Sequence, residues 1–136
     1  MAKTNTLKNL SGVFYLRIAL GLMFLVHGFY KLVGLTSGAA QPMGMFQGFF
    51  GASIGPLVAW LVALIEFLGG AFLILGFLSW TSSFLLAAIM AGSIVLVHLG
   101  NWSAITQHLV FIAGLVAVMK SSNRECSLDE KFKLKF

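Results

Sequence analysis

Charged side chains are scarce in this sequence, because Asp, Glu, Lys and Arg together make up only 10% of its 136 residues. In soluble globular domains, about 25% of the residues are Asp, Glu, Lys or Arg. With 59% hydrophobic residues and a mean hydropathy of +0.95, the composition excludes a soluble enzyme domain of ordinary size. It predicts an integral membrane protein whose chemistry lies in or between its helices.

Cysteine is almost absent. Cys126 stands alone, so no intrachain disulfide can form, and we interpret this residue as an ordinary reduced surface thiol. The sequence also lacks CxxC and HxxxH spacings, and its methionines show no spacing typical of a metal site. We therefore expect no metal centre and interpret the methionines as bundle filling. A dinucleotide-binding fingerprint is missing as well, so electron transfer would require a bound quinone, a metal or a partner.

The formal net charge of +5 does not indicate a nucleic-acid partner. A nucleic-acid interface presents a basic face with interleaved aromatic residues, whereas most of the basic residues here lie in the two polar tails. By the positive-inside rule, this distribution predicts that both tails are cytoplasmic. The tail residues concerned are Lys3, Lys8, Lys120, Arg124, Lys131, Lys133 and Lys135.

Four apolar segments are long enough to be considered as membrane spans. A span needs about 17 to 25 residues, and the third and fourth segments meet this only marginally. A three-helix alternative would leave the apolar run "LVFIAGLVAVM" without a core. We therefore predict one all-α domain over 1–136, a transmembrane four-helix bundle followed by a cytoplasmic tail at 120–136. The expected spans are 12–33, 57–78, 84–99 and 102–119.

Local signals mark two of the span boundaries. Asn101 or Ser103 can cap the last helix, with Trp102 near the headgroups. The long loop before the second span contains "MFQGFFGASIGP", whose phenylalanines are spaced for one face of a short interfacial helix. Lys31 interrupts the signal-peptide pattern that the first span otherwise resembles, so we expect an uncleaved anchor.

A stripe of polar and small residues runs along the first predicted span. At about 100° per residue, five positions fall within this stripe: Arg17, Gly21, Phe24, Gly28 and Lys31. His27 borders the stripe. Small residues let membrane helices approach closely. We therefore expect helix packing at Gly21 and Gly28 and at the glycines of the second span, Gly69, Gly70 and Gly76.

Glu66 lies near the middle of the second predicted span. A charge at the bilayer centre costs about 2.5 to more than 10 kcal/mol, so this carboxyl should be protonated or paired inside the bundle. A rise of about 1.5 Å per residue places Glu66 at a depth between Arg17 and His27, with Lys31 farther out. We favour a network of Glu66 with Arg17 or His27; a purely structural buried ion pair is the alternative.

All three histidines are expected in the outer half of the bundle, His98 and His108 on either side of the short outer loop. Together with Lys31, Glu66 and Trp102 they could line a polar cavity that opens outward. Such a cavity would suit a quinone head group, a small anion, a proton relay or a metal. The alternatives are interfacial histidines, and lysine and arginine side chains that extend to the headgroups.

Three stretches together resemble the DoxX family of small four-helix membrane proteins, over nearly the whole chain. They are "LRIALGLMFLVHGFYKL", "GPLVAWLVALIEFLGGAFLILGFLS" and "ECSLDEKF". The resemblance implies a prokaryotic cytoplasmic-membrane protein linked to redox metabolism. The family includes membrane subunits of thiosulfate:quinone oxidoreductase, but membership does not establish catalysis.

The leading hypothesis is a redox-associated membrane subunit with a polar quinone or small-ligand site built from Arg17, His27, Lys31 and Glu66. A small-solute or proton transporter is the second hypothesis, and a membrane scaffold that docks soluble redox enzymes through its tail is the third. Beyond the lipid membrane, the expected partners are soluble or membrane redox proteins. The identity of the ligand, enzymatic activity and homo-oligomerisation stay open.

Overall fold

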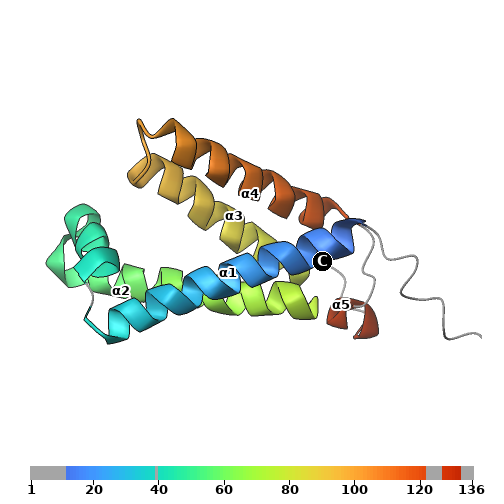
Figure 1. Ribbon diagram of the computed structural model, residues 1–136. Helices are drawn as coiled ribbons and strands as arrows, with labels where there is room; N and C mark the ends of the chain where they lie inside the picture. Colours follow the sequence, from blue (N-terminus) through green and yellow to red (C-terminus); the bar gives the residue numbers. More distant parts are fainter. Residues whose placement is uncertain (1–11, 39, 122–126, 133–136) are drawn as a thin grey trace, which may run out of the picture.

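A computed structural model describes residues 12–38, 40–121 and 127–132 (Figure 1). The described chain is all-α, with helices α1 (Gly12–Thr36), α2 (Ala40–Leu75), α3 (Ser79–Leu96) and α4 (Trp102–Lys120) and a single turn, α5 (Leu128–Lys131). The first four helices are each long and apolar enough to cross a membrane. The predicted all-α fold with four such helices is confirmed. Cys126 and most of the basic tail residues lie outside the described ranges.

The four long helices form two antiparallel pairs, α1 with α2 and α3 with α4. The pairs lie close together where α1 begins and α4 ends, and they separate toward the α3–α4 turn (Figure 1). We call these the tail end and the loop end of the bundle. Seven buried apolar side chains from all four helices fill the space between the pairs: Leu20, Phe24, Leu73, Leu86, Met90, Leu115 and Val118.

Helix α2 is kinked at Gly51, whose φ of 78° and ψ of 167° are not helical. Glycine adopts a positive φ at little cost because it has no Cβ. The part of α2 before the kink folds back onto the part after it, where the backbones of Phe46 and Gln47 approach Gly55 so closely that a Cβ there would overlap them. Residues 40–50, between α1 and the kink, are thus helical; the location of this segment at a membrane interface stays a prediction.

The tail end is closed by the segment around α5. Helix α3 begins at Ser79, earlier than the expected boundary at 84, and is preceded by Leu78 in the left-handed conformation, whose side chain provides no cap. Asp129 supplies the missing cap instead. Its carboxylate accepts hydrogen bonds from the backbone N–H groups of Leu78, at 2.7 Å, and Ser79, at 2.9 Å. An anionic cap satisfies free N–H groups and complements the helix dipole, which explains why "SWTSS" is helical rather than a loop.

The loop end contains the short turn between α3 and α4. Asn101 caps α4 by accepting a hydrogen bond from the N–H of Ala104, at 3.2 Å, as one of the two expected capping residues. The backbone N–H of Asn101 in turn donates to the carbonyl of His98, at 2.9 Å. This turn fixes His98 at the end of α3, close to the first turns of α4.

Candidate functional site

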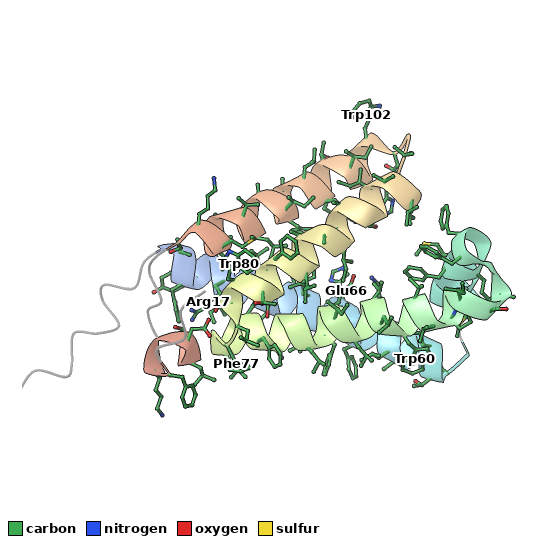
Figure 2. All side chains as sticks on the ribbon, turned by 180° about the vertical axis from the view of Figure 1, so that it is seen from behind. Arg17, Trp60, Glu66, Phe77, Trp80 and Trp102 are labelled. Atoms are coloured by element: carbon green, nitrogen blue, oxygen red, sulfur yellow. The ribbon has the colours of Figure 1, made fainter. Side chains whose placement is uncertain are left out.

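The candidate site centres on an ion pair between α1 and α2. The Lys31 Nζ atom donates a hydrogen bond to Oε1 of Glu66 at 2.6 Å. The Glu66 side chain is 1% exposed, whereas that of Lys31 is 33% exposed. Figure 2 shows Glu66 directed from α2 into the interior of the bundle. The carboxylate is therefore held inside the protein, and the lysine connects it to the accessible space.

Close packing of α1 on α2 brings the two charged groups together. A Cβ at Gly28 would collide with the backbone of Phe67, the residue after Glu66, and a Cβ at Gly70 would collide with the backbone of Leu25. At Gly21 a Cβ would lie 2.9 Å from the carbonyl oxygen of Gly70. Such glycine contacts let membrane helices pack at short range. Lys31 lies about one turn beyond Gly28 on the same face, so this packing places its side chain beside Glu66.

The second carboxylate oxygen of Glu66, Oε2, is buried and has no hydrogen-bond partner among the described residues. Leaving a buried polar atom unsatisfied costs about 1–3 kcal/mol, and more when it carries charge. Native proteins satisfy most such atoms with protein groups or ordered water. Oε2 is therefore a position where a ligand or water can be bound with a gain in free energy.

Two adjoining cavities meet at the Lys31–Glu66 pair. The first has an empty volume of about 770 Å³, open mouth included, and lies between all four helices. Its wall contains all three histidines, and we call it the histidine-lined cavity. The second, of about 550 Å³, has a wall that is almost entirely apolar, and we call it the apolar cavity. Lys31, Glu66, Met45, Ser93 and Val97 line both of them.

The apolar cavity lies between α2 and α3, beneath the segment before the Gly51 kink. Phe46 and Phe50 of that segment line it, together with Val58 and Val62 of α2 and Leu96 of α3. Phe49 is not part of this wall and is 51% exposed. The two aromatic rings therefore form part of an apolar wall next to a buried charge pair.

The three predicted histidines line the other cavity from three different elements. His27 of α1 and His108 of α4 each donate from Nδ1 to the backbone carbonyl four residues earlier, Met23 at 2.9 Å and Ala104 at 2.7 Å. The ring centroids of His98 and His108 are 4.7 Å apart. His98 follows the end of α3, outside the apolar helix, and its pKa is lowered first by burial and second by the neighbouring His108.

Arg17 lies elsewhere, at the tail end of the bundle, although its guanidinium is also buried. A Cβ at Gly76 would lie 2.9 Å from its Nη1 atom and 2.5 Å from the Cβ of Ser127. Figure 2 shows the same separation, with Arg17 near α5 and Glu66 farther along α2. The structure therefore pairs Glu66 with Lys31, not with the favoured Arg17 or His27. The estimate from axial rise missed this contact because the long lysine side chain spans the difference in depth.

The remaining expected positions divide between the two ends. Gly69 packs against the Leu86 side chain of α3, and Gly76 lies in the α2–α3 turn with a φ of 65°. Trp102 is 78% exposed at the loop end (Figure 2) and does not line the histidine-lined cavity. Sequence reasoning did not identify the wall residues Met23, Met45, Met90 and Gln107. These residues lie on helix faces that meet in the bundle. The sequence does not reveal which faces meet, so it could not indicate them.

The arrangement offers a buried negative charge, a partly accessible ammonium group, three imidazoles and an apolar chamber. Lysine can donate hydrogen bonds to a carbonyl or an anion, and imidazole can accept or donate a proton near neutral pH. Within the described residues, no three side chains of His, Cys, Asp and Glu are grouped to hold a metal ion. A charged pair and imidazoles beside an apolar chamber can together recognise an amphipathic ligand.

Four apolar helices and a charge pair buried between them define a multi-pass membrane protein. The sequence profile of the DoxX family matches residues 12–99, which include α1, α2, α3 and the Lys31–Glu66 pair. The chain belongs to the DoxX family. No match was found among curated proteins or among solved structures.

Proposed function

We propose that this protein is a redox-associated membrane subunit that binds a quinone between α1, α2 and α3. The observation that carries the proposal is the position of the Lys31–Glu66 pair, where a histidine-lined cavity and an apolar cavity adjoin. A quinone has a polar ring with two carbonyl acceptors and an apolar tail. The polar ring matches the wall of the histidine-lined cavity, and the apolar tail matches the wall of the apolar cavity.

The polar residues would orient the quinone ring. Lysine carries three donors, and Lys31 uses one of them on Glu66, so it can also donate to a ring carbonyl. The buried Oε2 atom of Glu66, which has no partner among the described residues, would accept a hydrogen bond from the hydroxyl of the reduced form. The tail would lie along Phe46, Phe50 and Leu96 in the apolar cavity. When bound, the quinone would supply the electron-carrying chemistry that the side chains lack.

The proposal includes a single DoxX-type domain over 1–136 in a prokaryotic cytoplasmic membrane, with both termini in the cytoplasm. The support is the basic tails flanking spans whose connecting segments contain almost no Lys or Arg. In this orientation the segment before Gly51 lies at the outer interface. The partners are redox proteins that deliver or accept electrons.

Quinone binding to the purified full chain in lipid nanodiscs tests the proposal. We expect the wild type to bind a short-chain quinone and Glu66→Gln to bind it at least tenfold more weakly. Asp129→Asn is the matched control, because it also converts a buried acid to an amide, but at the tail end. Wild-type protein that neither retains nor binds quinone would refute the assignment, as would equal losses in the two variants.

A transporter for small solutes or protons is the second candidate. The observation in its favour is the open cavity that leads past the histidines to the buried carboxylate of Glu66. Substrate or proton flux into proteoliposomes distinguishes the two functions. A redox subunit gives no substrate-dependent flux, whereas a transporter gives flux that Glu66→Gln abolishes.

A further inference from the structure

His98 and His108 form a side-by-side pair at the loop end of the histidine-lined cavity. Their ring centroids lie 4.7 Å apart with the ring planes tilted by 46°. The α3–α4 turn fixes the pair, since the backbone of His98 donates to Ser93 and accepts from Asn101. The two rings are thus brought together by the fold itself, and both face a cavity rather than the apolar core.

Hydrogen bonding fixes the tautomer of His108. Its Nδ1 atom lies 2.7 Å from the carbonyl oxygen of Ala104, and a carbonyl can only accept, so Nδ1 carries the proton. In the neutral ring the lone pair is then on Nε2. A histidine ligand of a metal ion commonly donates its other ring N–H to a backbone carbonyl in this way. This leaves Nε2 as the ring atom of His108 that is available to a ligand.

Methionine side chains supply a second type of donor in the same cavity. Met23 of α1, Met45 of α2 and Met90 of α3 all contribute to its wall. The sequence spacing gave no sign of this, because the three residues lie on different helices and line one cavity only in the folded bundle. Thioether sulfur is a soft ligand, and together with imidazole it favours Cu(I) over harder ions.

The charged groups of the cavity also favour Cu(I) over harder ions. Its one carboxylate, Glu66, is paired with Lys31, so the metal ligands that remain in the wall are imidazoles and thioethers. Mg²⁺ and Ca²⁺ require several oxygen ligands, and structural Zn²⁺ sites use four nitrogen, sulfur or carboxylate ligands. A soft monovalent ion is satisfied by fewer, neutral ligands.

We propose that His98 and His108 bind Cu(I) at the loop end of the histidine-lined cavity, with a thioether from the cavity methionines as a further ligand. The site is distinct from the proposed quinone site, because it does not use the Lys31 ammonium or the Glu66 carboxylate. It revises the expectation that the protein has no metal site. That expectation rested on sequence spacing, whereas these ligands come from separate helices.

Cu(I) binding is measured on the full chain in lipid nanodiscs at pH 7.5 under anaerobic conditions, by competition with a chromophoric Cu(I) chelator. We expect one Cu(I) per chain. His98→Ala/His108→Ala should weaken binding at least 100-fold, and His98→Phe/His108→Phe, which keeps the ring volume, should do the same. Thr106→Ala, an exposed polar residue of α4, is the control and should bind as the wild type does.

Two further measurements identify the ligands. X-ray absorption of the Cu(I) form should show nitrogen and sulfur neighbours, and replacement of Met23, Met45 and Met90 together by leucine should remove the sulfur signal. Zn²⁺ should bind at least tenfold more weakly than Cu(I). Cu(I) binding that survives both double histidine variants, a spectrum without sulfur, or a preference for Zn²⁺ would overturn the proposal. Lys31→Met/Glu66→Gln removes the polar centre of the proposed quinone site but leaves the cavity without an added charge. It should leave Cu(I) binding intact while weakening quinone binding, so failure of the quinone assignment is distinguishable from failure of this one.

Discussion

Lys31 and Glu66 are 35 positions apart in the chain, yet the Lys31 Nζ and Glu66 Oε1 atoms lie 2.6 Å apart. The pair differs from a surface salt bridge because the carboxylate is almost completely buried. Exposed ion pairs contribute about 0–1 kcal/mol, whereas removing one partner of a buried pair leaves an uncompensated charge. The pair is therefore both a structural contact and the polar centre of the candidate ligand site.

Replacing Lys31 by methionine should be more damaging than replacing both partners. The single variant leaves the Glu66 carboxylate buried without its cation, which we expect to destabilise the bundle by about 3–5 kcal/mol. Lys31→Met/Glu66→Gln removes the charge as well and should recover part of that loss. Unfolding of the wild type, the two single variants and the double variant in detergent gives the coupling energy. Additive losses would mean that the two side chains do not interact.

Gly28→Ala should separate α1 from α2. The added Cβ would overlap the backbone of Phe67, which cannot move aside without displacing the helix, and overpacking of this kind costs about 1–3 kcal/mol. Gly92→Ala in α3 is the matched control, since a Cβ there meets nothing within 4 Å. We expect Gly28→Ala alone to lower the midpoint of thermal unfolding. Equal behaviour of the two variants would contradict the close α1–α2 packing.

Asp129→Ala should weaken the start of α3. The variant removes the two hydrogen bonds to the N–H groups of Leu78 and Ser79, and loss of a helix cap costs about 0.5–2 kcal/mol. Lys131→Ala, at an exposed position of α5, serves as the control. Hydrogen exchange of the Leu78 and Ser79 amides should accelerate in Asp129→Ala only. Unchanged protection of these amides would show that the carboxylate is not their partner.

The stability of the loop end should depend on pH through His98. Burial, and secondarily His108, lower the pKa of His98 below its ordinary value of 6.5. The unfolded chain then takes up a proton that the folded chain does not, so stability falls as the pH drops through about 6.5. We expect the unfolding midpoint to decrease from pH 7.5 to pH 5.5, and to decrease less in His98→Gln. An equal decrease in both proteins would exclude this origin.

Much of the fold could be predicted because it depends on local properties. The apolar segments give the four helices, and Asn101 marks the start of α4. The start of α3 at Ser79 could not be predicted from its own residues, since its cap comes from Asp129, which is 50 positions later in the chain. The kink at Gly51 was also not predicted, because a single glycine in the sequence does not show where the chain folds back.

Most polar residues of the cavity walls could be selected from the sequence, but the partner of Glu66 could not. Lys31, Glu66 and the three histidines could be selected because polar groups are costly in a membrane span. The partner of Glu66 could not be chosen, because axial depth ignores the length and direction of a side chain. Arg17 satisfies the same sequence criteria, yet it lies at the tail end beside Gly76 and Ser127. The methionines of the cavity wall could not be selected, because their selection requires knowing which helix faces meet.

Photo-crosslinking with a light-activated quinone analogue tests the central claim most directly. The labelled full chain, irradiated in nanodiscs and mapped by peptide mass spectrometry, should carry the label on residues of the two adjoining cavities, such as Phe46, Phe50 and Leu96. Excess natural quinone should suppress this labelling, and Glu66→Gln should reduce it. Labelling confined to exposed apolar residues outside the two cavities, such as Leu57 and Val110, and unaffected by competitor, would contradict a quinone site at the Lys31–Glu66 pair.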